Sequence, residues 1–170
     1  MLITKCISPD VDEVLELYEF ARRLQQERKM LVWPHFDKSF LQKEIADERQ
    51  WKIVIAERLA CNWAITYEDK EIWEGRDNNN GVYIHRIAAH PDFRGSRFID
   101  DIVRWAKQHA KEKGRPFVRL DTVSNNTRLI EHYTSAGFEF LGMLTLTNTA
   151  TLPLHYQQQP NRCLFEMRAF

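Results

Sequence analysis

The sequence predicts a mixed α/β fold in which about seven strands form one sheet and about four helices flank it. Two observations lead to this prediction. Apolar segments of strand length alternate along the chain with segments of helical periodicity, and the last two strand segments follow each other as a C-terminal hairpin. The 170 residues show neither a repeat nor an interdomain linker, so we expect a single domain over residues 1–170.

Seven segments have the length and apolar content of strands. They lie at residues 1–7, 51–56, 59–67, 82–89, 117–121, 138–147 and 162–169. The second and third are close enough to be joined by a tight turn at Glu57 and Arg58, although the usual Asn-Gly pair is missing there. Two polar stretches, residues 68–81 and 148–161, are expected to be surface loops.

Four segments show helical periodicity, at about residues 8–28, 37–48, 96–113 and 126–135. Ser8 and Pro9 give the first helix a cap and a first-turn proline. Gly114 and Pro116 end the third helix in the expected order. The inner face of the third helix is formed by Ile99, Ile102, Val103, Ala106 and Ala110.

Composition excludes several classes of protein. Lys and Arg number 24, as do Asp and Glu, so the basic excess typical of a nucleic-acid-binding protein is missing. We expect no membrane partner, because no apolar run approaches spanning length, and no signal peptide, because a basic leader is missing. The three cysteines, Cys6, Cys61 and Cys163, lie in apolar segments without metal-ligand spacing. Buried reduced thiols and a cytoplasmic location are therefore predicted.

The connection between the fourth strand and the third helix is the most informative segment. The apolar run at 82–89 is followed by His90-Pro91-Asp92-Phe93-Arg94-Gly95-Ser96-Arg97 and then by an amphipathic helix. A short turn of this kind points the unpaired N–H groups of the helix outward, where they can bind a phosphate or pyrophosphate. The alternative is a plain strand-to-helix corner that binds no ligand.

This segment and the later run Asn126-Thr127-Arg128-Leu129-Ile130-Glu131-His132-Tyr133, followed by Ala136-Gly137-Phe138, together resemble the GNAT superfamily of N-acetyltransferases. The likeness is strong over residues 82–142 and holds in outline elsewhere. It implies the acyl-CoA N-acyltransferase fold, with a twisted, mostly antiparallel mixed sheet. It also implies an enzyme that transfers an acetyl group from acetyl-CoA, its co-substrate, directly to a primary amine of a small molecule or peptide.

The resemblance implies which residues hold the pyrophosphate, but the turn departs from the superfamily pattern. Arg94 matches the first position, whereas Arg97 and Ile99 stand where glycine and a small residue are usual. The Arg97 side chain either obstructs the phosphates or pairs with them in place of close backbone approach. The residues implied are Arg94, Gly95, Ser96, Arg97, Phe98 and Ile99.

The pantetheine arm of acetyl-CoA is expected on the fourth strand. The resemblance assigns its hydrogen bonds to the backbone of Ile87, Ala88 and Ala89 and to the side chain of Asn126. Asn126 also has the alternative role of a helix cap, which Asn125 could fill equally well.

Acetyl transfer to an amine also needs a proton donor and a proton acceptor. Tyr133 has the superfamily's spacing for the acid, and a tyrosine with an ordinary pKa of about 10 can protonate a thiolate; packing in the core is the alternative. For the base, strand alternation puts His85 on the cofactor-side face with Ile87 and Ala89, and a histidine suits proton abstraction near neutral pH. Asp121, at the end of the fifth strand, is the second candidate for the base.

Other functional assignments are weaker. Glu57 and Glu166 are further options for the base, and the spacing of the histidines identifies no metal ligands. The resemblance allows a homodimer, although no apolar seam indicates one. The second reading of function is a non-catalytic acyl-CoA sensor or interaction module of the same fold. The resemblance also implies that the first two helices and the loop between the last two strands shape the acceptor pocket, where the chain has the aromatic and amide residues Trp33, His35, Phe36, His155, Tyr156 and Gln157 to Gln159.

Overall fold

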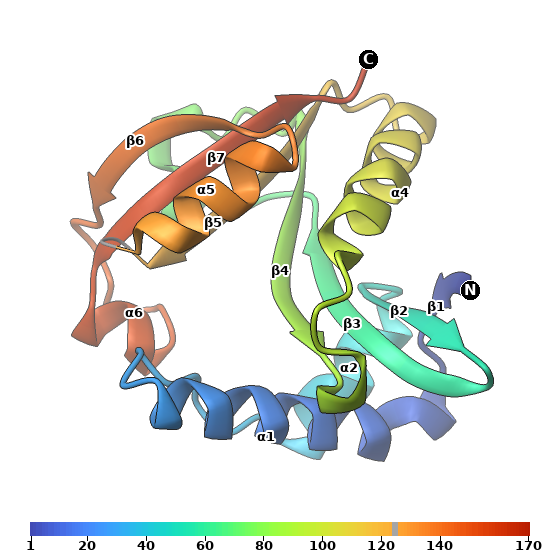
Figure 1. Ribbon diagram of the computed structural model, residues 1–170. Helices are drawn as coiled ribbons and strands as arrows, with labels where there is room; N and C mark the ends of the chain where they lie inside the picture. Colours follow the sequence, from blue (N-terminus) through green and yellow to red (C-terminus); the bar gives the residue numbers. More distant parts are fainter. Residues whose placement is uncertain (124–125) are drawn as a thin grey trace. The chain divides into compact units, whose positions relative to one another are not determined.

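A computed structural model describes residues 1–123 and 126–170. Its seven strands form one sheet in the order β1-β2-β3-β4-β5-β7-β6 (Figure 1). Their bounds are β1 Leu2–Lys5, β2 Gln50–Ile55, β3 Arg58–Thr66, β4 Gly81–Ala89, β5 Phe117–Val123, β6 Glu139–Thr145 and β7 Asn161–Arg168. The seven predicted strands are therefore confirmed, each within a few residues of its expected bounds.

The strand pairing is mixed and mostly antiparallel, as the resemblance implied. Strand β2 pairs antiparallel with both β1 and β3, and β7 pairs antiparallel with both β5 and β6. Strands β4 and β5 are parallel, and the connection between parallel strands needs a crossover, which helix α4 supplies.

Six α-helices are present in the described residues, two more than expected. They are α1 Val11–Glu27, α2 Lys38–Ala46, α3 Lys70–Trp73, α4 Phe98–Glu112, α5 Thr127–Ser135 and α6 Leu154–Gln158. The additional helices, α3 and α6, are single turns in segments that were predicted to be loops. Polarity misled that prediction, because Ile72, Trp73 and Leu152 in these segments are buried. Within the same described residues, no helix combines the length and apolarity needed to cross a bilayer.

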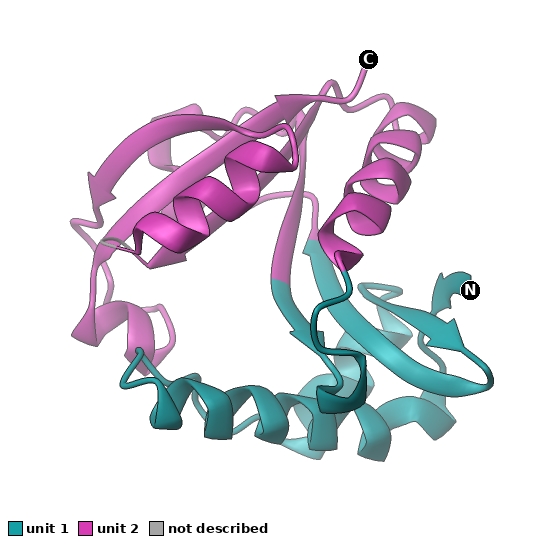
Figure 2. Cartoon of the chain, in the orientation of Figure 1, with its two compact units in different colours: residues 1–65, 86–96 teal, residues 66–85, 97–170 magenta. Residues whose placement is uncertain are grey.

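The chain divides into two compact units (Figure 2). Unit 1 comprises residues 1–65 and 86–96, and unit 2 comprises residues 66–85 and 97–170. The three boundaries fall at the end of β3, between Ile65 and Thr66, inside β4, between His85 and Arg86, and in the turn before α4, between Ser96 and Arg97. The prediction of one domain over residues 1–170 stays a prediction.

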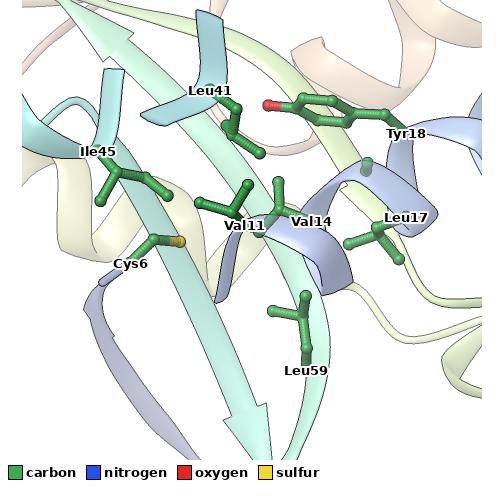
Figure 3. Close-up of a cluster of buried hydrophobic side chains, with 9 residues drawn as sticks. Cys6, Val11, Val14, Leu17, Tyr18, Leu41, Ile45 and Leu59 are labelled. Atoms are coloured by element: carbon green, nitrogen blue, oxygen red, sulfur yellow. The ribbon is translucent and has the colours of Figure 1, made fainter. Parts of the chain in front are cut away.

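Unit 1 has an apolar core between α1, α2 and the N-terminal strands (Figure 3). Its buried members are Cys6, Val11, Val14, Leu17, Tyr18, Leu41, Ile45, Leu59 and Ala88. Beside this core, the Tyr18 hydroxyl donates to the Gln50 side chain at 3.2 Å, and Gln50 in turn donates to Glu44 at 2.6 Å. These buried polar side chains satisfy one another, which is the condition for burying them at low cost.

The hairpin between β2 and β3 turns without the usual Asn-Gly pair. Ala56 and Glu57 both have positive φ, 48° and 63°, the left-handed conformation at both central positions that a two-residue hairpin turn requires. Neither residue is a glycine, so the strand pairing of β2 with β3 imposes a conformation that the local sequence does not favour.

Unit 2 holds a second apolar cluster around α3, β4 and β7, with Ile72, Trp73, Tyr83, Leu146, Leu152 and Leu164 as its buried members. The buried Arg119 of β5 lies next to it. Its guanidinium donates to Glu166 and to the Tyr83 hydroxyl, each at 2.7 Å, and lies over the Trp73 ring. In Figure 1, α5 lies alongside the strands β5 and β7 of this unit.

Candidate active site

The candidate site in unit 2 lies where β4 and β5 stop pairing. Their parallel ladder runs from Gly81 opposite Phe117 to Ile84 opposite Leu120. His85 and Asp121 are the next residues on the two strands, so the end of the ladder brings the two candidates for the base close together. Strand geometry alone therefore accounts for this part of the site.

A third titratable side chain, Asp69, joins His85 and Asp121. Asp69 immediately precedes α3, and one atom from each of the three side chains lies within 4.8 Å of the others. His85 Nε2 lies 3.9 Å from Asp69 Oδ2 and 3.0 Å from the hydroxyl oxygen of Thr66. The structure thus groups a histidine, two carboxylates and a hydroxyl at one place.

Asp69 is the most electrostatically perturbed member of this group. Its side chain is 11% exposed, and Oδ2 has no hydrogen-bond partner among the described residues. Burial first, and then the charges of Asp121, Asp77 and Glu71, raise the pKa of Asp69 to about 8. A carboxyl group of this kind holds or releases a proton near physiological pH.

Asp121 has a cationic partner that Asp69 lacks. The Arg162 guanidinium of β7 lies 2.6 Å from Asp121 Oδ2 and also donates to it from Nε at 2.7 Å. Arg162 itself stacks on the Tyr156 ring, with its Cζ atom 4.4 Å from the centroid. The Asp121 carboxylate is therefore already held by a close guanidinium, whereas Asp69 Oδ2 has no hydrogen bond among the described residues.

Tyr133, the predicted acid, is half-buried on α5. Its ring packs against Phe165 with centroids 5.3 Å apart and against Phe138 at 6.1 Å. Burial and the charge of Asp121 raise the pKa of Tyr133 to about 12. The hydroxyl therefore stays protonated at neutral pH, as a proton donor must. The charge of Asp121, a member of the group described above, contributes to this raised pKa.

Asn126 has the capping role that was its alternative. It is the N-cap residue of α5, and its Oδ1 accepts a hydrogen bond from the Leu129 backbone N–H at 3.2 Å. Capping uses the side-chain oxygen and leaves the amide nitrogen as a donor, so the expected contact with pantetheine stays a prediction. The competing candidate for the cap, Asn125, lies outside the described residues.

At the start of α4, the two positions that depart from the superfamily pattern, Arg97 and Ile99, differ in their exposure to solvent. Arg97 is exposed and pairs with Asp100 through two hydrogen bonds of 2.8 Å and 3.1 Å. Ile99 and its neighbour Phe98 are buried. The Ile99 side chain is therefore removed from solvent, whereas the Arg97 side chain lies at the surface and pairs with the first turn of α4.

The part of the turn that belongs to unit 1 is exposed. Arg94, Gly95 and Ser96 follow the short 3₁₀ turn Pro91–Phe93, whose end is closed by a hydrogen bond from the Arg94 N–H to the Pro91 carbonyl. Gly95 has φ of +90°, and a Cβ placed on it would have no atom within 4 Å. The backbone here demands glycine because of its conformation, and the space beside it is open.

The end of β4, also in unit 1, does not alternate as expected. Arg86 has φ of +52°, so the simple two-residue alternation that placed His85, Ile87 and Ala89 on one face does not run through this strand. Ala88 is buried in the unit 1 core, and Ala89 is exposed. The Arg86 guanidinium is held by an ion pair with the buried Glu44 and lies over the Phe40 ring, contacts that keep the unusual backbone in place.

The other residues that the sequence suggested for the base or the acceptor pocket lie in turns or contact neighbouring side chains. Glu166 accepts from Arg119 at 2.7 Å, and Glu57 occupies the β2–β3 turn. Among the residues expected to shape the acceptor pocket, Trp33 and Phe36 pack against the Tyr18 ring in unit 1. His155 and Tyr156 lie together on α6 in unit 2, with ring centroids 4.3 Å apart.

The structure groups His85 and Asp121, which the sequence named as candidates for the base, with Asp69 and Arg162, which the sequence did not single out. Asp69 lies in a charged stretch where one carboxylate looks like any other, and only the packing of α3 buries it. Arg162 is the second residue of β7, and the apolar pattern of that strand does not single it out. The chain pattern contains no signal for either residue, since both depend on contacts between distant segments.

The family model of the GNAT acetyltransferases matches residues 29–138, and the chain belongs to this family. It is 32% identical over 137 residues to an uncharacterized N-acetyltransferase of Methanocaldococcus jannaschii, a match that covers 76% of this chain and 57% of that protein. It is also 32% identical over 76 residues to the uncharacterized N-acetyltransferase YesJ of Bacillus subtilis, covering 44% of this chain and 41% of the relative. The matches therefore span only about half the length of these relatives.

Solved structures show the same fold. A GNAT family acetyltransferase of Listeria monocytogenes superposes with a TM-score of 0.79 at 21% identity, covering 98% of this chain and 94% of that one. The acetyltransferase yncA of Salmonella typhimurium, solved with acetyl-CoA, superposes with a TM-score of 0.70 at 12% identity, covering 99% and 94%. The predicted acyl-CoA N-acyltransferase fold is confirmed.

Proposed function

We propose that this protein transfers an acetyl group from acetyl-CoA directly to a primary amine of a small molecule or peptide. The observation that carries the proposal is Tyr133, a half-buried tyrosine whose pKa is raised to about 12 and which is influenced by Asp121 beside the base candidates. A reaction that expels a thiolate needs a donor of this kind. The family membership and the yncA complex with acetyl-CoA support the choice of co-substrate.

The start of α4 fits the pyrophosphate of acetyl-CoA. A helix of 15 residues begins here, and the N-terminal end of a helix carries partial positive charge that attracts an anion. The open space beside Gly95 suits close approach of a phosphate. The residues that would hold this part of the co-substrate are Arg94, Gly95, Ser96, Arg97, Phe98 and Ile99, and those that would hold pantetheine are Ile87, Ala88, Ala89 and Asn126.

In the proposed reaction, His85 is the base. The acceptor nitrogen forms a C–N bond to the acetyl carbon as the C–S bond of the thioester breaks. An ammonium acceptor loses two protons: His85 takes one, and the other replaces the proton that Tyr133 gives to the departing sulfur. We assign the base to His85 rather than Asp121, because Arg162 already compensates the Asp121 carboxylate.

The test combines cofactor binding with turnover. Calorimetric titration with acetyl-CoA is expected to give micromolar affinity, and a screen of amines, read by thiol release, is expected to find an acceptor. Tyr133→Phe should then lower kcat by about 10² to 10⁴-fold, the usual contribution of a general acid, while leaving the affinity for acetyl-CoA within about twofold. The phenylalanine keeps the packing against Phe165 and Phe138, so folding is not at risk.

The outcomes separate the readings of function. Binding without turnover on any amine would favour the non-catalytic acyl-CoA sensor, for which Tyr133→Phe changes nothing. No binding at millimolar acetyl-CoA would contradict both the enzyme and the sensor. A full loss of cofactor affinity in Tyr133→Phe would mean that this residue is structural, and the assignment of the acid would be wrong.

A further inference from the structure

We infer that Asp69 and His85 act as a coupled pair, in which Asp69 is a positioning residue for the base. The inference rests on the proposed function and adds a residue that the chain pattern did not indicate. The two side chains are 11% and 15% exposed, and Oδ2 of Asp69 lies 3.9 Å from Nε2 of His85. Asp69 orients the His85 ring together with Thr66, whose hydroxyl oxygen lies 3.0 Å from Nε2, and His85 takes the proton of the acceptor amine. The carboxylate then stabilises the imidazolium that forms.

The hydrogen bonds around the pair favour Asp69 for this role over Asp121. Asp121 accepts from Arg162 at 2.7 Å, whereas Asp69 Oδ2 is buried without a hydrogen-bond partner in the parts of the chain described here. A buried carboxylate oxygen without a partner is costly, and a protonated imidazole beside it removes that cost. The backbone of Asp69 is fixed independently, because its N–H donates to Asp77 at 2.5 Å and its carbonyl accepts from Trp73 at 2.8 Å.

The charges that face Asp69 come from every element around it. Asp121 of β5, Asp77 before β4 and Glu71 of α3 disfavour its ionised form, and Arg162 of β7 favours it. With burial, they raise the pKa of Asp69 to about 8. Asp69 therefore loses its proton on the alkaline side of neutrality, and we expect that proton to be shared with His85, so that the apparent pKa belongs to the pair. The form able to accept a proton has ionised Asp69 and neutral His85.

A metal ion is a weaker explanation of the same group. Atoms of Asp69, His85 and Asp121 lie close enough together to surround a cation. However, a divalent ion there would lie beside the Arg162 guanidinium, which is 2.6 Å from Asp121. Repulsion at such short range opposes the ion, whereas a shared proton needs no further ligand.

The kinetic test is the pH profile of kcat/KM for Asp69→Asn, measured from pH 6 to 10 with the acceptor found by the amine screen. In the native protein the rising limb should have its midpoint near pH 8. In Asp69→Asn the midpoint should move to lower pH by about one unit, toward the ordinary value of a histidine. The alkaline plateau should fall by about tenfold or more, because the remaining base is weaker. Unchanged midpoints with a lower rate would mean that Asp69 is only structural and would overturn the inference.

Glu68→Gln is the matched control for this measurement. Glu68 precedes Asp69 in the chain, but it is exposed and pairs with Lys70 at 3.0 Å. Removal of its charge should leave the midpoint and the plateau unchanged. An equal shift in Glu68→Gln would show a general effect of charge in this loop, and the specific pair would be wrong.

A second measurement does not depend on catalysis. Titration of the His85 imidazole by nuclear magnetic resonance, without substrate, should give a lower pKa in Asp69→Asn than in the native protein, because the carboxylate no longer stabilises the charged ring. Coupled titration in a protein that shows no acetyl transfer would refute the proposed function and leave the pair intact. Identical titration curves would refute the pair. Micromolar binding of Zn²⁺ that abolishes the His85 titration would identify a metal centre instead.

Discussion

At the scale of single residues, Asp69 shows how burial turns an ordinary carboxyl group into one that titrates near neutral pH. The side chain is acidic in sequence and lies in a charged stretch, yet the packing of α3 removes it from water. Ionisation of the buried Asp69 carboxyl costs free energy, and a protonated His85 beside it would supply the compensating positive charge. The two side chains meet only because β3, β4 and α3 bring Thr66, His85 and Asp69 together.

The raised pKa of Asp69 has a consequence for stability. Its ordinary pKa is 3.8, whereas in the folded protein it is about 8, so between these pH values the folded chain holds more protons than the unfolded chain. The free energy of unfolding therefore falls as the pH rises through this window. Asp69→Asn cannot ionise, and its stability relative to the native protein should increase from pH 5 to pH 8.5 by about 4 kcal/mol.

Urea unfolding at pH 5 and at pH 8.5 measures this difference. The asparagine preserves the size of the side chain and leaves the backbone hydrogen bonds of Asp69 in place. Glu68→Gln, which changes an exposed charge in the same loop, should show no such trend. A stability difference that is the same at both pH values would mean that Asp69 ionises normally in the folded protein.

At the scale of elements, the start of α4 decides how the departures from the superfamily pattern are tolerated. Ile99 lies in the helical backbone of α4, which accepts any side chain, and Arg97 is its N-cap residue with a negative φ of −87°, so neither residue prevents the helix from forming. Ile99 is buried, and Arg97 lies along the first turn, where it neutralises Asp100. Without that arginine, the Asp100 carboxylate would repel an anion at the N-terminus of the helix.

Arg97→Ala tests this role. We expect the affinity for CoA to fall by about three- to tenfold, the range of an exposed charge near a helix end. The loss should shrink at high salt, because exposed charges are screened. Calorimetry at 50 mM and at 500 mM NaCl measures both effects.

Asp100→Asn is the opposite variant of the same pair and should bind CoA at least as tightly as the native protein. Tighter binding by Arg97→Ala would show instead that the arginine obstructs the phosphates. In that case the turn would be degenerate in function as well as in sequence.

At the scale of the whole molecule, the three cysteines are distributed over the buried interior of both units. Cys6 and Cys61 lie in unit 1 and Cys163 in unit 2, and all three are buried. Burial raises the pKa of both Cys6 and Cys61 to about 12. Thiols of this kind are inert toward reagents that attack the thiolate.

The native protein should therefore react with a disulfide reagent such as DTNB only at the rate of unfolding, and it should release three equivalents of thiolate in guanidinium. A variant with an exposed cysteine, Lys111→Cys, should release one equivalent at once. Rapid reaction of the native chain would contradict the buried placement. It would also rule out DTNB for following CoA release in the assays proposed above.

The sequence by itself determined the seven strands, the four longer helices and the family. Those features depend on local periodicity and on short motifs whose spacing survives in the chain. It also indicated Tyr133, His85 and Asp121, because residue type and position in a motif are local properties. It failed at residues 68–81 and 148–161, where a few buried apolar side chains among many polar ones create α3 and α6.

Only the tertiary structure decided which side chains share a site and which charge each carries. The grouping of Asp69 with His85, the pairing of Asp121 with Arg162 and the positive φ of Arg86 depend on segments far apart in the chain. A pKa depends on burial and on neighbouring charges, both of which are properties of packing. The acid and base candidates are therefore chosen from the tertiary structure, whereas the motifs in the sequence identify the family.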